Sequence, residues 1–383
     1  MKFGLYVHWP YCQSKCPYCD FNSHVATAID PERWISAYQH EISRIAEACP
    51  DHILSTIFIG GGTPSLMDPR IVDSLVRSAT DAWRTANDIE ISMEANPGSV
   101  ESGRFKSYAL AGVNRVSLGV QSLNDDHLAR LGRLHGRREA LRAVEIAQAN
   151  FQRVNLDLIY ARQHQTIPDW SAELNEAISL GTGHLSLYQL TIEDGTVFSR
   201  RHSAGQLKGL PDEDSAAEMF ELTQDICEAA GLPAYEVSNH ARIDEQCRHN
   251  LIYWNSGIYA GVGPGAHGRV MLGHQRVATE AIRDPRAWLE AVETQGSGDL
   301  PTVELSQDEQ TAETILMGLR LVDGIPNSTF ARMGVNLNTW TSLVEMTQEG
   351  YLARSDHAVQ ATPKGRILLN SVIARLLSDI AEH

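Results

Sequence analysis

Long apolar segments are absent from this chain of 383 residues, although 43% of its residues are hydrophobic. A helix that crosses a bilayer needs about 18–20 consecutive apolar residues, and no such run occurs. The first residues also lack the basic segment followed by an apolar segment that is typical of an export signal. We therefore expect no transmembrane helix and a cytoplasmic location.

Positive charge is also scarce. The chain has 32 Lys and Arg residues against 48 Asp and Glu residues, which gives a net charge of −16. Such a surface repels nucleic acid and anionic lipid unless a local basic patch overrides it. The densest basic segment, residues 133–138, is too short for that role. The composition therefore predicts no nucleic-acid partner.

Cysteine is infrequent, with six residues, but Cys12, Cys16 and Cys19 lie together with the spacing C-x3-C-x2-C. Three thiolates on one loop suit an iron–sulfur cube in which one iron has no protein ligand. Zinc is the alternative, but a closed zinc site needs four ligands, and His8 and His24 are the nearby candidates for the fourth. A disulfide is disfavoured because three is an odd number. The motif therefore predicts a metal centre and favours a 4Fe–4S cluster.

This spacing resembles that of the radical S-adenosylmethionine (radical SAM) superfamily. The aromatic residue just before the third cysteine, Tyr18, also fits the family pattern. The resemblance implies that the open iron binds the amino and carboxylate groups of SAM. It further implies that the reduced cluster can release a 5′-deoxyadenosyl radical.

Buried strands alternate with helices over about the first 230 residues. Asp30 before Pro31 and Asp68 before Pro69 are typical helix starts, because the Asp side chain can cap the helix and Pro is tolerated at its first position. The alternation predicts parallel strands joined by crossover helices. The resemblance implies an α/β fold with a partial (β/α)6 radical SAM barrel, and the count of six strand–helix units agrees. The predicted strands cover residues 3–9, 56–59, 89–93, 115–120, 154–159 and 184–190.

The pattern changes after residue 295. Residues 296–301 are rich in Gly and end in Pro, which indicates a linker. The following segments resemble a small winged-helix domain. We therefore predict a radical SAM partial-barrel domain over residues 1–295 and a winged-helix-like domain over residues 301–383. The second domain has six basic and ten acidic residues, which favours a lid facing a protein or ligand over a DNA-binding role.

Residues that can carry chemistry lie at the ends of the predicted strands, where α/β barrels place their sites. The glycines at 60–62 can let the backbone approach a ligand, or can simply form a tight turn. Glu94 can accept hydrogen bonds from two ribose hydroxyls, as in dinucleotide folds, or can form a surface salt bridge. Arg133 can pair with a carboxylate as a fork. The family resemblance implies SAM contacts for Tyr6, Tyr18, Gly61, Gly62, Thr63, Glu94, Gln121, Arg133 and Asp157.

A narrower resemblance covers nearly the whole chain. His8–Cys12 and Cys16–Ser23 resemble the oxygen-independent coproporphyrinogen III oxidase group, and His249–Trp254 fits the H-N-x-x-Y-W motif of its HemW heme chaperone branch. True oxidases of the group have a further cysteine where this chain has Phe21. The resemblance implies heme binding by His249, since a neutral imidazole is a common axial ligand of heme iron. A hydrogen-bonded structural histidine is the alternative, and Cys247 is another candidate ligand.

Two functions are consistent with these motifs. The first is a heme chaperone that transfers heme to acceptor proteins and carries a 4Fe–4S cluster and SAM. The second is a radical SAM coproporphyrinogen III oxidase, which performs an oxidative decarboxylation in porphyrin biosynthesis. Phe21 and the His249 motif favour a chaperone without oxidase activity, and the acidic charge disfavours a DNA-binding regulator. The resemblance implies heme-accepting proteins as partners, and it leaves open a homodimer and a peripheral membrane contact through an acceptor.

One segment departs from the family pattern. The fifth strand usually continues as Asp-Leu-Ile-Tyr-Gly-Leu-Pro before Gln-Thr, whereas here Tyr160 is followed by Ala161-Arg162-Gln163-His164. Asp157 is retained, but the Gly-Leu-Pro turn is not. The geometry of this loop is therefore open at the level of sequence.

Overall fold

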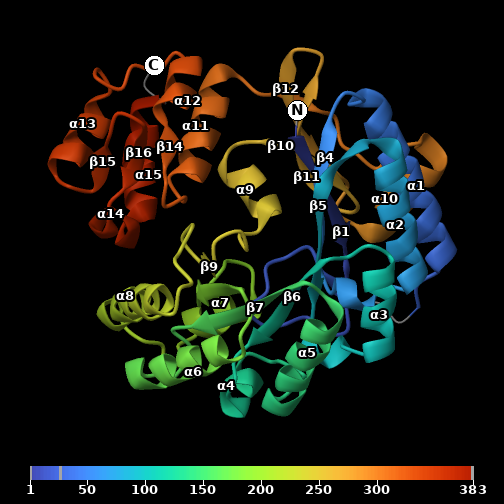
Figure 1. Ribbon diagram of the computed structural model, residues 1–383, viewed down its shortest axis with the longest axis horizontal. Coiled ribbons are helices and arrows are strands. Elements are labelled where there is room, and N and C mark those ends of the chain that lie inside the picture. Colours follow the sequence, from blue (N-terminus) through green and yellow to red (C-terminus); the bar gives the residue numbers. More distant parts are fainter. Residues whose placement is uncertain (1, 26–27, 381–383) are drawn as a thin grey trace.

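A mixed sheet of 11 strands, in the order β13-β12-β11-β10-β1-β4-β5-β6-β7-β8-β9, forms the centre of the protein (Figure 1). The computed structural model describes residues 2–25 and 28–380. The outer ends of the two predicted domains, residues 1 and 383, lie outside the described residues.

Six neighbouring strands of this sheet run parallel, as the sequence predicts. They form an open, partial barrel, because the sheet does not close on itself. The predicted α/β radical SAM architecture is thereby confirmed. The strands are β1 (Lys2–Trp9), β4 (Ile53–Gly61), β5 (Arg84–Ala95), β6 (Arg115–Gln121), β7 (Arg153–Tyr160) and β8 (His184–Gln189).

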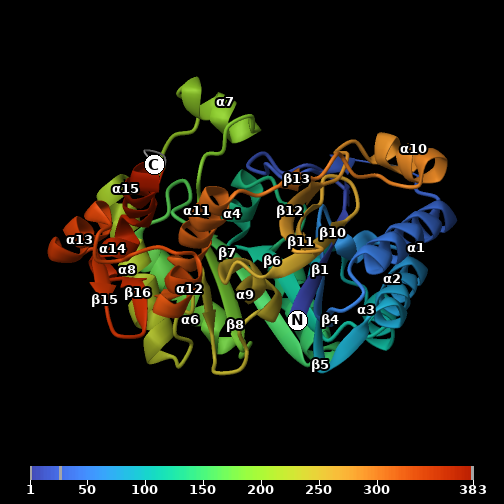
Figure 2. The same ribbon diagram turned by 90° about the horizontal axis from the view of Figure 1, so that it is seen from above.

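Helices connect these strands and cover the outside of the sheet (Figure 2). The side chains of Asp30 and Asp68 accept hydrogen bonds from backbone N–H groups at the starts of α1 and α2, so both predicted caps are present. The apolar faces of most of these helices pack onto the strands in one core, whereas Phe198 belongs to a smaller, separate cluster. The helices are α1 (Pro31–Ala48), α2 (Pro69–Ala82), α3 (Ser102–Leu110), α4 (Asp125–Arg130), α5 (Arg137–Asn150), α6 (Ile167–Ser179), α7 (Val197–Ser203) and α8 (Glu213–Ala229).

Five further strands extend the sheet beyond the six predicted ones. One of them pairs in parallel with β1, and the others add antiparallel strands at the two edges. These strands are short, so local periodicity gives only a weak signal for them, and the one that pairs with β1 is distant from it in sequence. They are β9 (Asn239–Ala241), β10 (Ile258–Val262), β11 (His267–Leu272), β12 (Gln275–Glu280) and β13 (Val303–Glu304).

The C-terminal segments have a hydrophobic core of their own, built around side chains such as Ile315, Phe330 and Leu376. Helices pack on a three-stranded sheet in the order β14-β16-β15, which is the winged-helix-like arrangement that the sequence predicts. The exact domain limits stay a prediction, and β13, which follows residue 301, pairs with β12 of the large sheet. The elements are α11 (Gln307–Gly318), β14 (Ile325–Pro326), α12 (Asn327–Arg332), α13 (Thr341–Gln348), β15 (Leu352–Arg354), β16 (Ala358–Ala361), α14 (Pro363–Ile367) and α15 (Leu369–Ile380).

The segments that join the two cores pack against helices and strands of the protein. Helix α9 (Arg248–Trp254) precedes β10 and contacts α11, and α10 (Pro285–Gln295) packs on α1. The predicted linker after α10 lies along the sheet, since Leu300 N donates to Glu280 O at 2.8 Å. No helix among the described residues is both long enough and apolar enough to span a bilayer.

Candidate functional site

The three cysteines of the motif lie beyond the carboxyl end of β1. Cys12 ends the short strand β2 (Tyr11–Cys12), which pairs with β3 (His24–Val25), and the other two lie in the loop between these strands. All three thiols are free and half-buried, whereas the other three cysteines are buried. The Thr63 hydroxyl donates to Cys12 Sγ at 3.3 Å, and Arg133 Nη1 donates to Cys16 Sγ at 3.3 Å. Groups from distant parts of the chain therefore reach this loop.

The electrostatics of the loop favour neutral thiols at Cys12 and Cys19 as long as no metal group binds them. Burial raises the pKa of the Cys12 and Cys19 thiols, and the hydrogen bond from Thr63 opposes that shift at Cys12. Within the described ranges, no group of three or more His, Cys, Asp or Glu side chains could hold a single metal ion. A cube binds each thiolate at a different iron, so its ligands need not converge on one point. Three free thiols with a neighbouring guanidinium therefore fit an anionic iron–sulfur cluster better than a zinc ion.

The glycine segment at the end of β4 packs against the first strand. Gly61 has φ +113°, and a Cβ there would lie 2.7 Å from the Trp9 carbonyl oxygen. A Cβ on Gly62 would lie 2.7 Å from the Tyr11 carbonyl oxygen. Within the described residues, these two glycines are thus closely approached by the backbone of Trp9 and Tyr11, whereas the sequence predicted a close approach by a ligand. Glycine is required here because β1 and β4 come together beside the cysteine loop.

Two carboxyl groups on nearby strands lie behind this segment. Glu94 Oε2 accepts a hydrogen bond from Gly61 N at 3.0 Å, and Asp157 Oδ1 accepts one from Ser117 Oγ at 3.0 Å. Burial, together with repulsion from Asp157, raises the pKa of Glu94 to about 8. Burial raises the pKa of Asp157 to about 6, against the effect of its hydrogen-bond donors. Both groups are suited to accept hydrogen bonds from a ligand that brings its own donors.

The remaining predicted SAM residues surround the cysteine loop. Gln121 ends β6 with φ +66°, in the left-handed region. Arg133 Nη2 donates to Gly119 O at 3.0 Å, and its Nη1 donates to Tyr18 OH at 3.3 Å. Tyr18 and Arg133 are therefore held together beside Cys16, and Thr63 lies beside Cys12. Their roles in SAM binding stay predictions.

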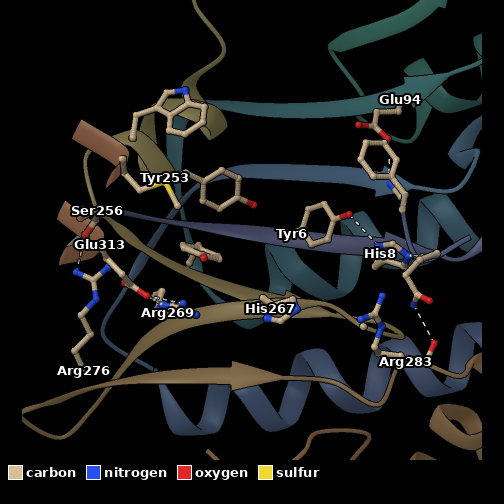
Figure 3. Close-up of a pocket in the computed structure, with 17 residues that line it drawn as sticks. Tyr6, His8, Glu94, Tyr253, Ser256, His267, Arg269, Arg276, Arg283 and Glu313 are labelled. Carbon is tan, nitrogen blue, oxygen red and sulfur yellow. Dashed lines mark hydrogen bonds and ion pairs between the residues drawn. The ribbon is translucent and has the colours of Figure 1, made fainter. Parts of the chain in front are cut away.

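A cavity of about 510 Å³ runs from this site towards helix α11 (Figure 3). Glu94 and His8 lie at one end of the cavity and Glu313 of α11 at the other, and Tyr6 lies between them (Figure 3). Its volume lies within the usual range for small-molecule pockets, about 300–1,000 Å³. The structure thus places part of the predicted SAM site and residues of α11 around one cavity of small-molecule size.

The H-N-x-x-Y-W segment forms helix α9, but its histidine is enclosed. His249 is 0% exposed. Its Nδ1 is 2.8 Å from Thr56 Oγ1, and its Nε2 is 2.6 Å from Tyr253 OH. Burial lowers the pKa of His249 to about 3, so the ring is neutral. The prediction that His249 binds heme iron stays a prediction, and it requires that the contact with Tyr253 break.

Glu90 holds the first turn of α9. Its carboxylate accepts hydrogen bonds from the backbone N–H groups of Arg248 and His249, at 3.2 and 3.1 Å, and pairs with Arg153 at 2.6 Å. Burial would raise the pKa of Glu90, but the neighbouring guanidinium groups of Arg115 and Arg153 hold it below its usual range. Cys247, the alternative ligand, is also fully buried, and its Sγ lies 3.7 Å from Glu90.

One residue that contacts the predicted SAM site was not identified from the sequence. Arg162 is buried, forms an ion pair with Glu173 and donates from Nη1 to the Gln121 carbonyl oxygen at 3.1 Å. It lies in the segment that departs from the family turn, and Ala161 there has φ +56°, a conformation that favours glycine. The loss of the family's Gly-Leu-Pro turn was the signal in the sequence that this segment has a different local structure. The new partner could not be identified because Glu173 and Gln121 are brought to Arg162 by the fold.

Comparisons with known proteins agree with this arrangement. Residues 6–175 match the Radical SAM superfamily, and residues 305–368 match the HemN C-terminal domain. The solved structure of coproporphyrinogen III oxidase (HemN) from Escherichia coli superposes with a TM-score of 0.82 at 19% identity. That alignment covers 98% of this chain and 89% of that chain. At this identity the likeness establishes the fold alone.

Closer relatives align over the full length. "Heme chaperone HemW" of Escherichia coli K12 is 37% identical over 381 residues, which cover 98% of each protein. The mitochondrial "Radical S-adenosyl methionine domain-containing protein 1" of Bos taurus is 35% identical over 392 residues, which cover 100% of this chain and 88% of that protein. Such identity over nearly the whole chain, with both family matches in order, leads to one conclusion: the chain belongs to the HemW family of the radical SAM superfamily.

Proposed function

We propose that the protein is a heme chaperone, which binds heme and transfers it to acceptor proteins. The observation that carries the proposal is the full-length similarity to proteins named heme chaperone HemW, at 37% and 34% identity in two bacteria. The cavity beside the cysteine loop supports it, because it has the size of a small-molecule pocket and is lined by residues of the H-N-x-x-Y-W helix. Six free thiols and the absence of a spanning helix among the described residues are compatible with the cytoplasm, where we propose that transfer occurs.

In this proposal Cys12, Cys16 and Cys19 hold a 4Fe–4S cluster. Arg133, which lies beside Cys16, would pair with the carboxylate of SAM, and Glu94 would accept hydrogen bonds from its ribose. When bound, the cluster would supply one-electron chemistry and a site for the amino and carboxylate groups of SAM. The chain's own contribution is to hold Arg133 beside the sulfurs and to offer the Glu94 and Asp157 carboxyls to the ribose.

The alternative function, an oxygen-independent coproporphyrinogen III oxidase, is favoured by one observation. A compound bound in the cavity would lie beside Tyr6 and Glu94 of the predicted SAM site, as an enzyme would require. Against it stands Phe21, whose side chain is 58% exposed and lines the cavity at the position where the oxidases have a further cysteine. A phenyl ring cannot act as a thiol in ligation or proton transfer.

Two parallel assays separate the functions. Anaerobically reconstituted protein is titrated with heme, and it is separately incubated with coproporphyrinogen III, SAM and a reductant. The chaperone proposal expects stoichiometric heme binding, transfer of heme to an apo-acceptor and no decarboxylated product. Formation of protoporphyrinogen IX without heme transfer would contradict it and would favour the oxidase.

A further inference from the structure

The histidines around the cavity differ in how far their ring nitrogens are engaged. His8 is buried, with Nδ1 3.0 Å from Tyr6 OH and Nε2 2.9 Å from Asn22 O. His249 is enclosed by Thr56 and Tyr253. His267, the first residue of β11, lines the cavity, and its side chain is 58% exposed. Its Nε2 is 4.0 Å from Glu280, beyond hydrogen-bond distance, and no hydrogen bond to either ring nitrogen occurs in the described part of the chain. His267 therefore presents a free imidazole to the cavity (Figure 3).

The walls near this imidazole suit a flat, largely apolar ring. Tyr253, Trp254 and Tyr259 line the cavity from α9 and β10, and the rings of Tyr253 and Tyr259 meet edge-to-face with centroids 4.4 Å apart. Aromatic faces bind flat apolar surfaces well, while polar tips stay hydrated or hydrogen-bonded. Trp254 Nε1 is buried without a hydrogen-bond partner among the described residues. An acceptor group on a ligand would satisfy it.

The cavity also carries more positive than negative charge, although the whole chain is acidic. Arg269, Arg276 and Arg283 line it, against the carboxyls of Glu94 and Glu313. Arg269 pairs with Glu313 at 2.6 Å, and Arg276 donates to the Ser256 carbonyl oxygen at 2.7 Å. The exposed Arg283 side chain has no hydrogen bond or ion pair within the described ranges, and it lies at the same end of the cavity as His8 (Figure 3). A free guanidinium at a cavity mouth suits a carboxylate.

We propose that this cavity is the heme site, with His267 as the iron ligand and Arg283 as the partner of a propionate carboxylate. This inference rests on the proposed function and names the site where the cargo binds. A neutral imidazole can donate a nitrogen lone pair to iron without any protein contact having to break, which is not true of His249. His249 then acts as a positioning residue, which fixes Tyr253 through its Nε2 contact so that the aromatic wall of α9 stays in place.

The test is an anaerobic titration of the cluster-loaded full chain with hemin, followed through the Soret band and the low-temperature electron paramagnetic resonance spectrum. The variants are His267→Ala, His249→Ala and Arg283→Ala, and the matched control is His274→Ala in the turn of the same hairpin. His267→Ala should shift the Soret band and lose the electron paramagnetic resonance signal of imidazole-ligated ferric iron. Added imidazole should restore both spectra. Arg283→Ala should keep the wild-type spectrum and weaken binding about tenfold, the loss of one charge-assisted contact. His274→Ala should match the wild type.

Metal-free protoporphyrin IX separates iron ligation from recognition of the ring. It should bind to His267→Ala as it binds to the wild type, and about tenfold more weakly to Arg283→Ala. A His267→Ala protein with wild-type spectrum and affinity would overturn the inference, and a spectrum changed in His249→Ala alone would return the ligand to α9. If the wild type binds no heme at all, the proposed function fails, and this inference fails with it.

Discussion

The cysteine loop and helix α9 carry the two motifs of the chain, and they differ in whether their functional atoms are free. The three thiols of the loop are half-buried and unbonded to one another, and Thr63 and Arg133 approach them from outside the loop. Both nitrogens of His249 in α9 are already paired inside the protein. A polar group that is free beside a cavity is available to a ligand, whereas one that is satisfied inside the core stabilises the fold.

The difference extends to the charges around each motif. The first turn of helix α9 is held by hydrogen bonds to Glu90, which is fully buried and paired with Arg153. At the other site, Glu94 receives a single backbone donor and is repelled by Asp157. The first carboxylate is ionised and structural, and the second has unused acceptor capacity. Two acidic residues four positions apart on β5 therefore have opposite roles.

The largest effect should follow from changing the cysteine loop. Replacing Cys12, Cys16 and Cys19 by Ala together should abolish iron and sulfide binding, because no thiolate remains at the loop. Iron and acid-labile sulfide are measured after anaerobic reconstitution. The buried residue Cys227 gives the control, and Cys227→Ala should keep its cluster. Full iron content in the triple variant would refute the assignment.

The next effect concerns the support of α9. Glu90→Ala should destabilise the protein by about 3–5 kcal/mol, because the buried Arg115 loses a neighbouring carboxylate and Arg153 keeps only its pair with Glu245. Urea unfolding of the wild type and the variant measures the difference. Asp88, on the same strand and 73% exposed, pairs with Arg248 and serves as the control. Asp88→Ala should cost about 0–1 kcal/mol. Equal costs for both variants would show that Glu90 has no special structural role.

A smaller effect is expected for ligand binding at the other carboxylate of β5. Glu94→Ala should weaken SAM binding by about 1–3 kcal/mol, since one acceptor for the ribose hydroxyls is lost. Calorimetric titration of the cluster-loaded protein measures it. The Asp88→Ala variant should bind SAM as the wild type does. Unchanged affinity in Glu94→Ala would remove Glu94 from the predicted site.

The pH dependence of stability sharpens the same contrast. The folded pKa of Glu94 is about 8, raised from 4.5, so the folded state binds this proton more tightly than the unfolded state. The group therefore costs no stability at acidic pH and an increasing amount as the pH rises from 4.5 to 8. SAM-free Glu94→Gln should match the wild type near about pH 4.5 and be more stable above about pH 8, by at most a few kcal/mol. Urea midpoints at the two pH values measure this, and a parallel pH dependence in both proteins would contradict it.

The smallest effect concerns the loop that departs from the family turn. Ala161 has φ +56°, which costs an L-residue about 1 kcal/mol or more. Ala161→Gly should relieve this strain and stabilise the protein by up to about 1 kcal/mol, after the larger entropy of the unfolded glycine is subtracted. Thermal unfolding measures it. Ala172→Gly in the exposed face of α6 is the control, and it should destabilise by about 1 kcal/mol. Destabilisation by both substitutions would exclude strain at Ala161.

Much of the fold could be predicted because its signals are local. Buried runs and capped helix starts mark the six parallel strands and their helices, and the strand ends mark the positions of Glu94 and Gln121, whereas Asp157 lies within β7. The short strands β10 to β13 were not predicted. Their few residues carry too little periodicity, and the pairing that joins them to the sheet, between β10 and β1, spans more than 200 positions of the chain. The cavity that these strands line was therefore also invisible in the sequence.

The sequence by itself determined the chemistry that the chain can offer: three thiols with one spacing on one loop, a glycine segment after the second long strand and carboxyls at strand ends. The tertiary structure decided which of these groups are free. It brought Thr56, which is 193 positions away in the chain, into contact with His249, so that the histidine of the motif has a partner inside the protein. It left His267, which no motif marks, open at the cavity. Spacing along a chain fixes which residues are neighbours in a loop or helix turn, but whether a polar atom is satisfied depends on partners that only folding brings near.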